Sequence, residues 1–388
     1  MAEVIVFIIC ALLPAYGLRF KIGPLPTTAL EIILLIAIGI LAYEIFIIKN
    51  FPRQSKPSYG SEKLFWIGAA IILIATIAGI IVAPSKLAAL GIARAYFWEP
   101  MIFSFLLIKI QPDGKKIFKA ALYGFALNAT LVAGYGIFQY FFPRLIPATY
   151  VADHRITSFY SYPNAIALYL APLIPLFLSA LWSLPLVVFG VLAIIMAKSA
   201  GGLIAVFAAL FVAGLSFKKS RVATIIVTIV VAAMLSFAPQ LSGLREQILM
   251  KDWSGRVHQI GWQESIAMLR DHPLWGAGLS GYPTAVKPYH TAVGVEIFQY
   301  PHNLFLAIWS ELGVLGLLGF LIIFVWFFST VFRRYKLQPT TYNLKLLAAA
   351  IVAILVHGLV DVPYFKNDLS LMFWIFIAIT AIMRREVK

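Results

Sequence analysis

Charged residues are scarce in this sequence. Only 12% of its 388 residues are charged, whereas 62% are hydrophobic. The apolar residues fall in runs that can cross the hydrocarbon core of a bilayer, which is roughly 30 Å thick and takes about 20 helical residues. Between these runs, no segment keeps the alternation of a half-solvated element over any length. The composition therefore argues against a soluble domain and predicts an all-α protein that crosses the membrane many times.

Cysteine is almost absent. The one cysteine, Cys10, lies inside the first apolar run, which excludes a disulfide framework or a cysteine metal cluster within the chain. The sequence also lacks a Walker lysine loop, a dinucleotide glycine fingerprint and a His-Glu-x-x-His zinc helix. No Asp-x-Asp pair is present to hold a diphosphate through a divalent cation. We therefore expect no metal and no cofactor, and any bound diphosphate must be neutralised by Arg and Lys.

Acidic residues are about half as numerous as basic ones, with 16 Asp and Glu against 31 Lys and Arg and a net charge of +15. In a membrane protein, such an excess is first explained by loop topology, and we expect no nucleic-acid partner. The apolar runs predict about twelve spans. These are 3–18, 27–48, 64–83, 87–108, 117–142, 164–181, 184–198, 200–216, 221–238, 302–332, 344–360 and 369–383.

The basic clusters orient these spans. With an even number of spans, one face holds both termini and all of the basic clusters, which are KNFPRQSKPSYGSEK, KIQPDGKKIFK, KKSR, RRYK and MRREVK. Because cytoplasmic loops hold the excess Lys and Arg, that face is predicted to be the cytoplasm. The first run, EVIVFIICALLPAYGL, has no positive residue before it and no clear cleavage site, so we interpret it as a retained span rather than a signal peptide.

The opposite face receives the loop 143–163 and one long loop, 239–301, for which short helices are predicted. Five of the six histidines lie in or beside the outer loops. The loop 239–301 is small for an independent domain, so residues 1–388 are predicted to form a single integral membrane domain. Any chemistry is expected on the outer side.

His302 and Asn303 open the tenth run. Pro301 suits the first turn of a helix, which predicts a helix start there and the imidazole at the positive end of the helix dipole. A neutral histidine at this position could accept a proton as a general base. The alternative is that His and Asn are ordinary residues of a membrane interface.

Basic residues near the outer surface could bind phosphate. Arg256 offers a planar fork for phosphate oxygens, and His258 lies two residues further along. Lys198 and Ser199 fall at the outer mouth of two spans, and Arg155 lies in the loop 143–163. For each of these the alternative is a structural role, as an interfacial arginine that snorkels or a close helix contact.

Asp361 follows His357 by four residues. Residues at this spacing share a helix face, so the carboxylate could orient that imidazole or an arginine of another loop. A capping acid at a helix end is an equally good interpretation.

Four features follow one another along the C-terminal part of the chain: SGR and then DHPLWGAG in a long outer loop, PHNLFLAIWSELGVLG at the start of the next span, and a final span pair. Because of these features and their order, the chain from Thr157 to the C-terminus resembles the O-antigen ligase and polymerase superfamily. The resemblance implies a GT-C-like membrane glycosyltransferase of the bacterial cytoplasmic membrane, with its active site facing the periplasm or cell exterior. It also implies a metal-independent, inverting transfer from an undecaprenyl-diphosphate-linked glycan.

The resemblance further implies that Arg256 grips the diphosphate and that His302 activates the acceptor hydroxyl. Asn303, Ser199, Arg155, His258 and Asp361 are additional candidates for contacting substrate. A second family arginine, expected in a Ser-Arg-Gly stretch, is replaced here by Ala200, and Lys198 could supply its charge.

The acceptor stays open: lipid A core, another lipid-linked repeat unit or a protein hydroxyl would each fit, with a slight preference for the ligase-like reaction. The rival from another class is a transporter of the lipid-linked glycan. A transporter predicts ionisable residues near the bilayer midplane. Arg94 is the only obvious charge of this kind, which favours surface chemistry.

Overall fold

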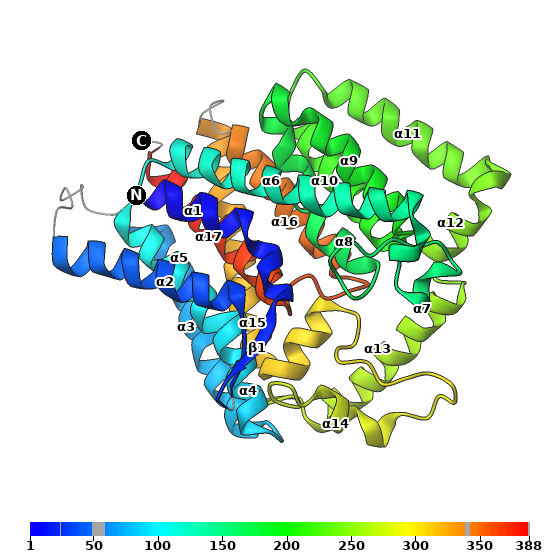
Figure 1. Cartoon of the computed structure of the whole chain (residues 1–388), viewed down its shortest axis with the longest axis horizontal. Coiled ribbons are helices and arrows are strands. Elements are labelled where there is room, and N and C mark those ends of the chain that lie inside the picture. Colours follow the sequence, from blue (N-terminus) through cyan, green and yellow to red (C-terminus); the bar gives the residue numbers. More distant parts are fainter. Residues whose placement is uncertain (24, 49–58, 338–341, 387–388) are drawn as a thin grey trace.

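The computed structural model describes residues 1–388 except 24, 49–58, 338–341 and 387–388. Helices make up nearly all of the regular structure in this part of the chain, which confirms the all-α prediction in outline (Figure 1). Buried apolar side chains from the first helix to the last form one continuous core. A small second cluster, which includes Met268 and Tyr282, lies in the segment predicted as the long outer loop.

Several helices are long and apolar enough to cross a membrane, so the protein is a multi-pass membrane protein. Six segments meet this test, namely Ala29–Phe46, Lys63–Val82, Lys86–Ile110, Gly114–Phe141, Leu304–Phe332 and Asn367–Arg385. A seventh is added if Arg221–Phe237 and the helix that follows it at a bend of 86° count as one span. Five shorter apolar helices are Ala2–Ala11, Asn164–Ser179, Leu181–Met196, Ala200–Ser216 and Tyr342–His357. The predicted number of twelve crossings stays a prediction.

The α-helices of the N-terminal half are α1 (Ala2–Ala11), α2 (Ala29–Tyr43), α3 (Tyr59–Val82), α4 (Lys86–Ile92), α5 (Glu99–Ile110), α6 (Gly114–Phe141), α7 (Ala148–Val151) and α8 (Asn164–Leu170). Those of the C-terminal half are α9 (Leu184–Met196), α10 (Ala200–Ser216), α11 (Arg221–Phe237), α12 (Ser242–Ile248), α13 (Trp253–Asp271), α14 (Tyr282–Val286), α15 (Leu304–Leu337), α16 (Tyr342–His357) and α17 (Asn367–Glu386). Short 3₁₀ or π segments join several of them.

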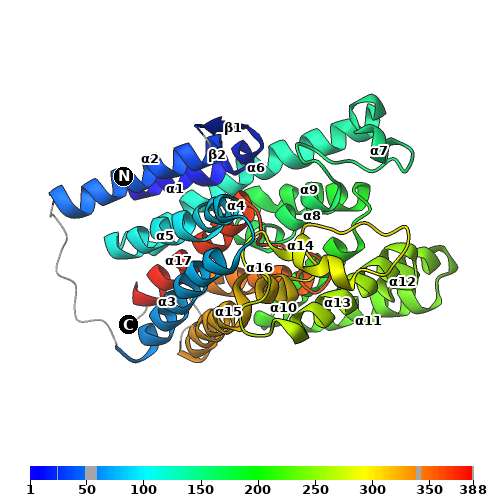
Figure 2. The same ribbon diagram turned by 90° about the horizontal axis from the view of Figure 1, so that it is seen from below.

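Both termini lie at one end of the molecule, and α7 and α12 lie at the other (Figures 1 and 2). That both termini face the cytoplasm stays a prediction. The basic cluster predicted at 49–63 lies mostly outside the described residues.

A β-hairpin after the first helix was not predicted. β1 (Arg19–Ile22) pairs antiparallel with β2 (Leu25–Thr28), and Thr28 then caps α2. The Thr28 hydroxyl accepts a hydrogen bond from the Glu31 amide, and the Glu31 carboxylate accepts one from the Thr28 amide. This capping box fixes the start of α2.

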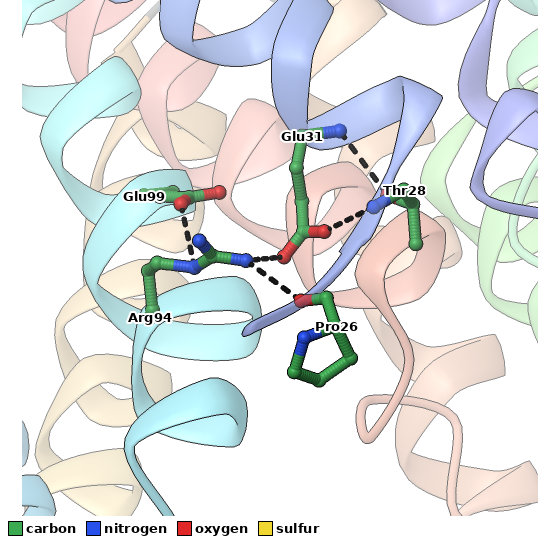
Figure 3. Close-up of polar contacts among 5 residues, drawn as sticks. All are labelled: Pro26, Thr28, Glu31, Arg94 and Glu99. Atoms are coloured by element: carbon green, nitrogen blue, oxygen red, sulfur yellow. Dashed lines mark hydrogen bonds and ion pairs between the residues drawn. The ribbon is translucent and has the colours of Figure 1, made fainter. Parts of the chain in front are cut away.

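The hairpin is held to α4 and α5 by a cluster of charged side chains (Figure 3). The Arg94 guanidinium is 2.8 Å from a carboxylate oxygen of Glu31 and 3.2 Å from one of Glu99, and it donates a hydrogen bond to the Pro26 carbonyl. Arg94 lies in a π-helical segment, Ala93–Trp98, between α4 and α5. The charge that the sequence placed in mid-span is therefore paired, and Glu31 is a partner that the sequence did not indicate.

α15 differs from the single straight span predicted for 302–332. It begins at Leu304, and its backbone breaks at Gly313, where φ is 67° and ψ is −174°. The DHPLWGAG segment packs into this break. Ala277 donates its amide proton to the Ser310 carbonyl at 2.7 Å, and Val314 donates to the Leu274 carbonyl at 3.1 Å. The motif therefore satisfies backbone groups that the break in α15 exposes.

Candidate functional site

A polar cavity of about 220 Å³ brings together four distant parts of the chain. The lining comes from the segment leading into α8, the junction of α9 and α10, the stretch from the end of α12 to the start of α13, and the end of α16 with the turn that follows it. Five predicted site residues line this cavity, namely Arg155, Lys198, Ser199, His258 and Asp361. The structure therefore gathers candidates from Arg155 to Asp361, which lie far apart in the sequence.

Arg155 is the best-oriented cation of the cavity. Its Nε donates to the Ala197 carbonyl at 3.0 Å, and its Nη2 donates to the Asn164 side-chain oxygen at 3.1 Å. These bonds use two of the five guanidinium N–H groups and leave the others for a ligand. Burial lowers the pKa of Arg155, although nearby Asp153 acts in the opposite direction. The cavity thus contains a fixed guanidinium that the sequence had ranked below Arg256.

Lys198 and Ser199 occupy the turn between α9 and α10. Lys198 is exposed, with φ at 53°, and its Nζ donates to the Asp153 carbonyl at 2.6 Å. Ser199 is the N-cap of α10, because its hydroxyl accepts from the Gly202 amide. A Cβ on Gly201 would lie 2.8 Å from a Val360 methyl group. Close packing therefore explains this glycine, as the alternative interpretation expected.

Arg256 lies apart from this group. The residue belongs to the first turns of α13, its side chain is exposed, and it is not among the residues that line the cavity. Its guanidinium lies 3.5 Å from the Lys251 carbonyl. Its neighbour Gly255 and, one turn further, His258 do face the cavity.

His302 does not begin the helix, which corrects the predicted start at Pro301. Asn303 caps α15 instead, since its side-chain oxygen accepts from the Phe305 and Leu306 amides, each at 3.0 Å. The Asn303 amide group also donates to the Leu359 carbonyl at 3.0 Å. Both ends of this side chain are thus used to hold the backbone, and they tie the start of α15 to the turn after α16.

His302 itself lies just before the cap, with a left-handed backbone at φ 47°. Its Nδ1 is 3.5 Å from an Asp361 carboxylate oxygen, an ion-pair distance that is longer than a good hydrogen bond. Spacing had suggested His357 as the partner of Asp361. In the described residues the ion-pair contact goes to His302, 59 positions earlier, and Asp361 also accepts from the Val362 amide.

The electrostatics of this pair follow from burial and proximity. Burial of Asp361 acts to raise the pKa of its carboxyl, but His302, followed by His357 and the Val362 amide, together outweigh this effect and the pKa falls to about 2. The carboxylate is therefore ionised at neutral pH.

His258 stacks on His302, with ring centroids 5.0 Å apart and ring planes at 22°. Burial, and then the neighbouring His302, lower the pKa of His258 to about 4, so this imidazole is neutral at pH 7. His258 also lines a smaller cavity of about 20 Å³, whose wall includes His302, Glu264 and Tyr282. That volume has room for roughly one water-sized group.

Residues 185–321 match the family model described as O-antigen ligase. Over these residues the chain is similar to the O-antigen ligase superfamily. The match confirms the predicted resemblance and indicates a glycan-transferring membrane enzyme. No curated protein matches the chain.

The O-antigen ligase segment contains Lys198, Ser199, Arg256, His258 and His302. Arg155 and Asp361 lie outside it on opposite sides and reach the cavity only through the fold. Sequence reasoning missed the contact between Asp361 and His302, because no spacing rule joins residues on separate helices. The one available signal was that both lie where an apolar run meets the predicted outer face.

Proposed function

We propose that this protein transfers an oligosaccharide or polysaccharide from an undecaprenyl-diphosphate carrier to an acceptor hydroxyl on the outer side of the cytoplasmic membrane. The reaction is O-antigen ligase-like, metal-independent and inverting. The observation that carries the proposal is the contact between His302 and Asp361 beside a cavity that contains Arg155 and Lys198.

His302 acts as the general base. With its Nδ1 facing the Asp361 carboxylate, the proton of the neutral imidazole belongs on Nδ1, and the lone pair of Nε2 is free to accept the proton of the acceptor hydroxyl. The carboxylate then stabilises the imidazolium that forms. The smaller cavity beside His302 has the size of such a hydroxyl.

The bond changes are a direct displacement at the anomeric carbon. The acceptor oxygen bonds to that carbon as its proton passes to His302, and the bond from the carbon to the phosphate oxygen breaks on the opposite face, which inverts the configuration. Undecaprenyl diphosphate leaves with one more negative charge. Arg155 and Lys198 offset this charge.

Arg155 takes the part of the arginine that the family resemblance would put at position 200. Its planar fork suits two phosphate oxygens, whereas the Lys198 ammonium provides a point charge. Arg256, on the exposed face of α13, adds to the positive potential around the cavity but does not bind the diphosphate. The proposed diphosphate site therefore rests on Arg155 first.

The test is a transfer assay with purified protein, lipid-linked glycan, a chelator and a panel of acceptors: lipid A core, a second lipid-linked glycan and a hydroxyl-bearing peptide. We expect covalent product with chelator present, and its identity reports the acceptor class. His302→Ala should abolish transfer. Glycan translocation without covalent product would favour the transporter instead, and activity lost to the chelator would contradict the metal-independent mechanism.

Arginine variants in the same assay test whether Arg155 or Arg256 binds the diphosphate. Arg155→Lys should raise the donor KM about tenfold, because a bidentate contact worth about 1.5 kcal/mol or more is lost. Arg256→Lys is the matched control and should change KM by less than about threefold. A larger rise in donor KM for Arg256→Lys than for Arg155→Lys would instead assign diphosphate binding to Arg256.

A further inference from the structure

The turn 358–366 between α16 and α17 carries Asp361 near its start and Lys366 at its end. One side of this turn is firmly held, since Tyr364 is buried and its hydroxyl donates to the Tyr96 carbonyl at 2.8 Å. The other side of the turn faces the segment before α8, and Lys366 contacts the tyrosines of that segment.

The Lys366 ammonium lies among three tyrosine rings. Its Nζ is 4.5 Å from the ring centroid of Tyr162, 5.1 Å from that of Tyr160 and 5.6 Å from that of Tyr16. It also donates a hydrogen bond to the Tyr16 hydroxyl at 3.4 Å. Distances below about 6 Å are those of a cation–π interaction. In the part of the chain that the structure describes, no carboxylate lies within ion-pair distance of Lys366, although Asp368 and Asp361 attract its charge from farther away.

Two of these tyrosines belong to the segment that orients Arg155. Tyr162 precedes by two residues Asn164, whose side-chain oxygen accepts from the Arg155 guanidinium. The same turn that contributes Lys366 holds the Asp361 carboxylate against His302. The contact between Lys366 and Tyr162 therefore connects the segment that orients Arg155 to the turn that holds Asp361 against His302.

We infer that Lys366 is a positioning residue of the transfer reaction: its contact with the tyrosine rings fixes the separation between Arg155 and the pair formed by Asp361 and His302. This inference rests on the proposed function. Lys366 touches neither substrate. It acts through the two segments that it joins, and a displacement of about 1 Å between a bound donor and its base can cost on the order of a hundredfold in rate.

The test measures kcat and donor KM for variants on both sides of the contact. Lys366→Met keeps the apolar stem and should lower kcat about ten- to hundredfold with a donor KM within about threefold of wild type, since Arg155 is intact. Lys366→Arg keeps a cation and should recover most of kcat. Tyr162→Phe keeps the ring and should stay close to wild type, whereas Tyr162→Leu removes the nearest of the three rings and should lower kcat, though by less than Lys366→Met does.

A double variant and a matched control separate positioning from general stability. Lys366→Met with Tyr162→Leu should be no slower than Lys366→Met alone, because without the ammonium the Tyr162 ring has no contact with it left to lose. Lys345→Met is the control: Lys345 lies 4.8 Å from the centroid of the Phe217 ring and outside the cavity lining, so its kcat should not change. Melting temperatures are measured for all variants.

The inference is overturned if Lys366→Met keeps kcat within twofold of wild type, if the two single effects multiply in the double variant, or if Tyr162→Phe is as slow as Tyr162→Leu. Absence of any glycosidic product from the wild-type protein is a different result, which defeats the proposed function itself.

Discussion

At the scale of single residues, the site depends on a histidine held in an unfavourable backbone conformation. A positive φ is uncommon for a residue with a β-carbon, and such residues gather at functional sites where the surroundings enforce them. Around His302 these surroundings are the Asn303 cap and the Trp262 indole, whose N–H donates to the His302 carbonyl at 3.2 Å. The imidazole is thereby aimed at Asp361 rather than along the axis of α15.

Replacing the carboxylate tests this arrangement. Asp361→Asn keeps the shape but removes the charge that stabilises the imidazolium, so kcat should fall about a hundredfold with little change in donor KM. Steady-state transfer kinetics provide the measurement. Asp113→Asn, at the cap of α6, is the control, because Asn caps a helix about as well as Asp. An unchanged kcat for Asp361→Asn would remove the carboxylate from the mechanism.

His258 makes stability depend on pH. Its pKa in the fold is about 4, below the ordinary value of 6.5, so between these values the unfolded chain binds a proton that the fold does not. Stability should therefore decrease as pH falls from about 6.5 to 4, by on the order of 1–3 kcal/mol. Melting temperatures across this range should show a smaller decrease for His258→Gln. Parallel curves for the two proteins would contradict the assignment.

At the scale of elements, the main unexpected feature is the interlock between the DHPLWGAG segment and the break in α15. Gly276 has φ +64°, and a Cβ there would lie 2.4 Å from the carbonyl oxygens of Trp309 and Ser310. Only glycine fits both the conformation and the space. The glycines of the motif thus have a packing reason that does not require a ligand.

Gly276→Ala should destabilise the protein by on the order of 2–4 kcal/mol, because backbone atoms must move to relieve the clash. The melting temperature of the purified protein is the measurement. Gly134→Ala is the control: this glycine of α6 has no heavy atom within 4 Å of the added Cβ, so the change should be neutral or slightly stabilising. A normal melting temperature for Gly276→Ala would show that the interlock is loose.

The elements also show what the sequence could predict. Apolar runs predicted the helices well, because length and hydropathy are local properties of the chain. The break at Gly313 and the hairpin before α2 were not predicted, since each is stabilised by contacts with distant segments. For the same reason the spacing of Asp361 indicated only His357 as a nearby histidine, whereas the fold also brings its carboxylate to His302.

At the scale of the whole molecule, a cluster of charged side chains inside the helical body joins several elements. Arg94 joins the hairpin, α2 and the continuous helical stretch from α4 to α5, and its partners Glu31 and Glu99 are both buried. Removing a single partner from such a group leaves uncompensated buried charge. The cluster is better explained by this structural role than by a transport pathway.

Arg94→Met should therefore cost roughly 3–5 kcal/mol, because two buried carboxylates lose their cation. The expected result is a marked loss of folded protein in detergent, measured by thermal unfolding and size-exclusion chromatography. Lys119→Met, which removes an exposed cation beside a tyrosine ring, should leave both unchanged. Normal stability of Arg94→Met would show that the carboxylates are neutral or hydrated.

The break in α15 also constrains biogenesis. A bilayer offers no hydrogen-bond partners to the backbone groups exposed near Gly313, and those partners come from residues 274–277, which leave the ribosome earlier. α3 lies against the same place, since Leu279 donates to the Gly79 carbonyl at 3.1 Å. We therefore expect residues 274–279 to lie beside α3 before α15 enters the membrane. Correct insertion of α15 then depends on the prior folding of the part of the chain that carries His258.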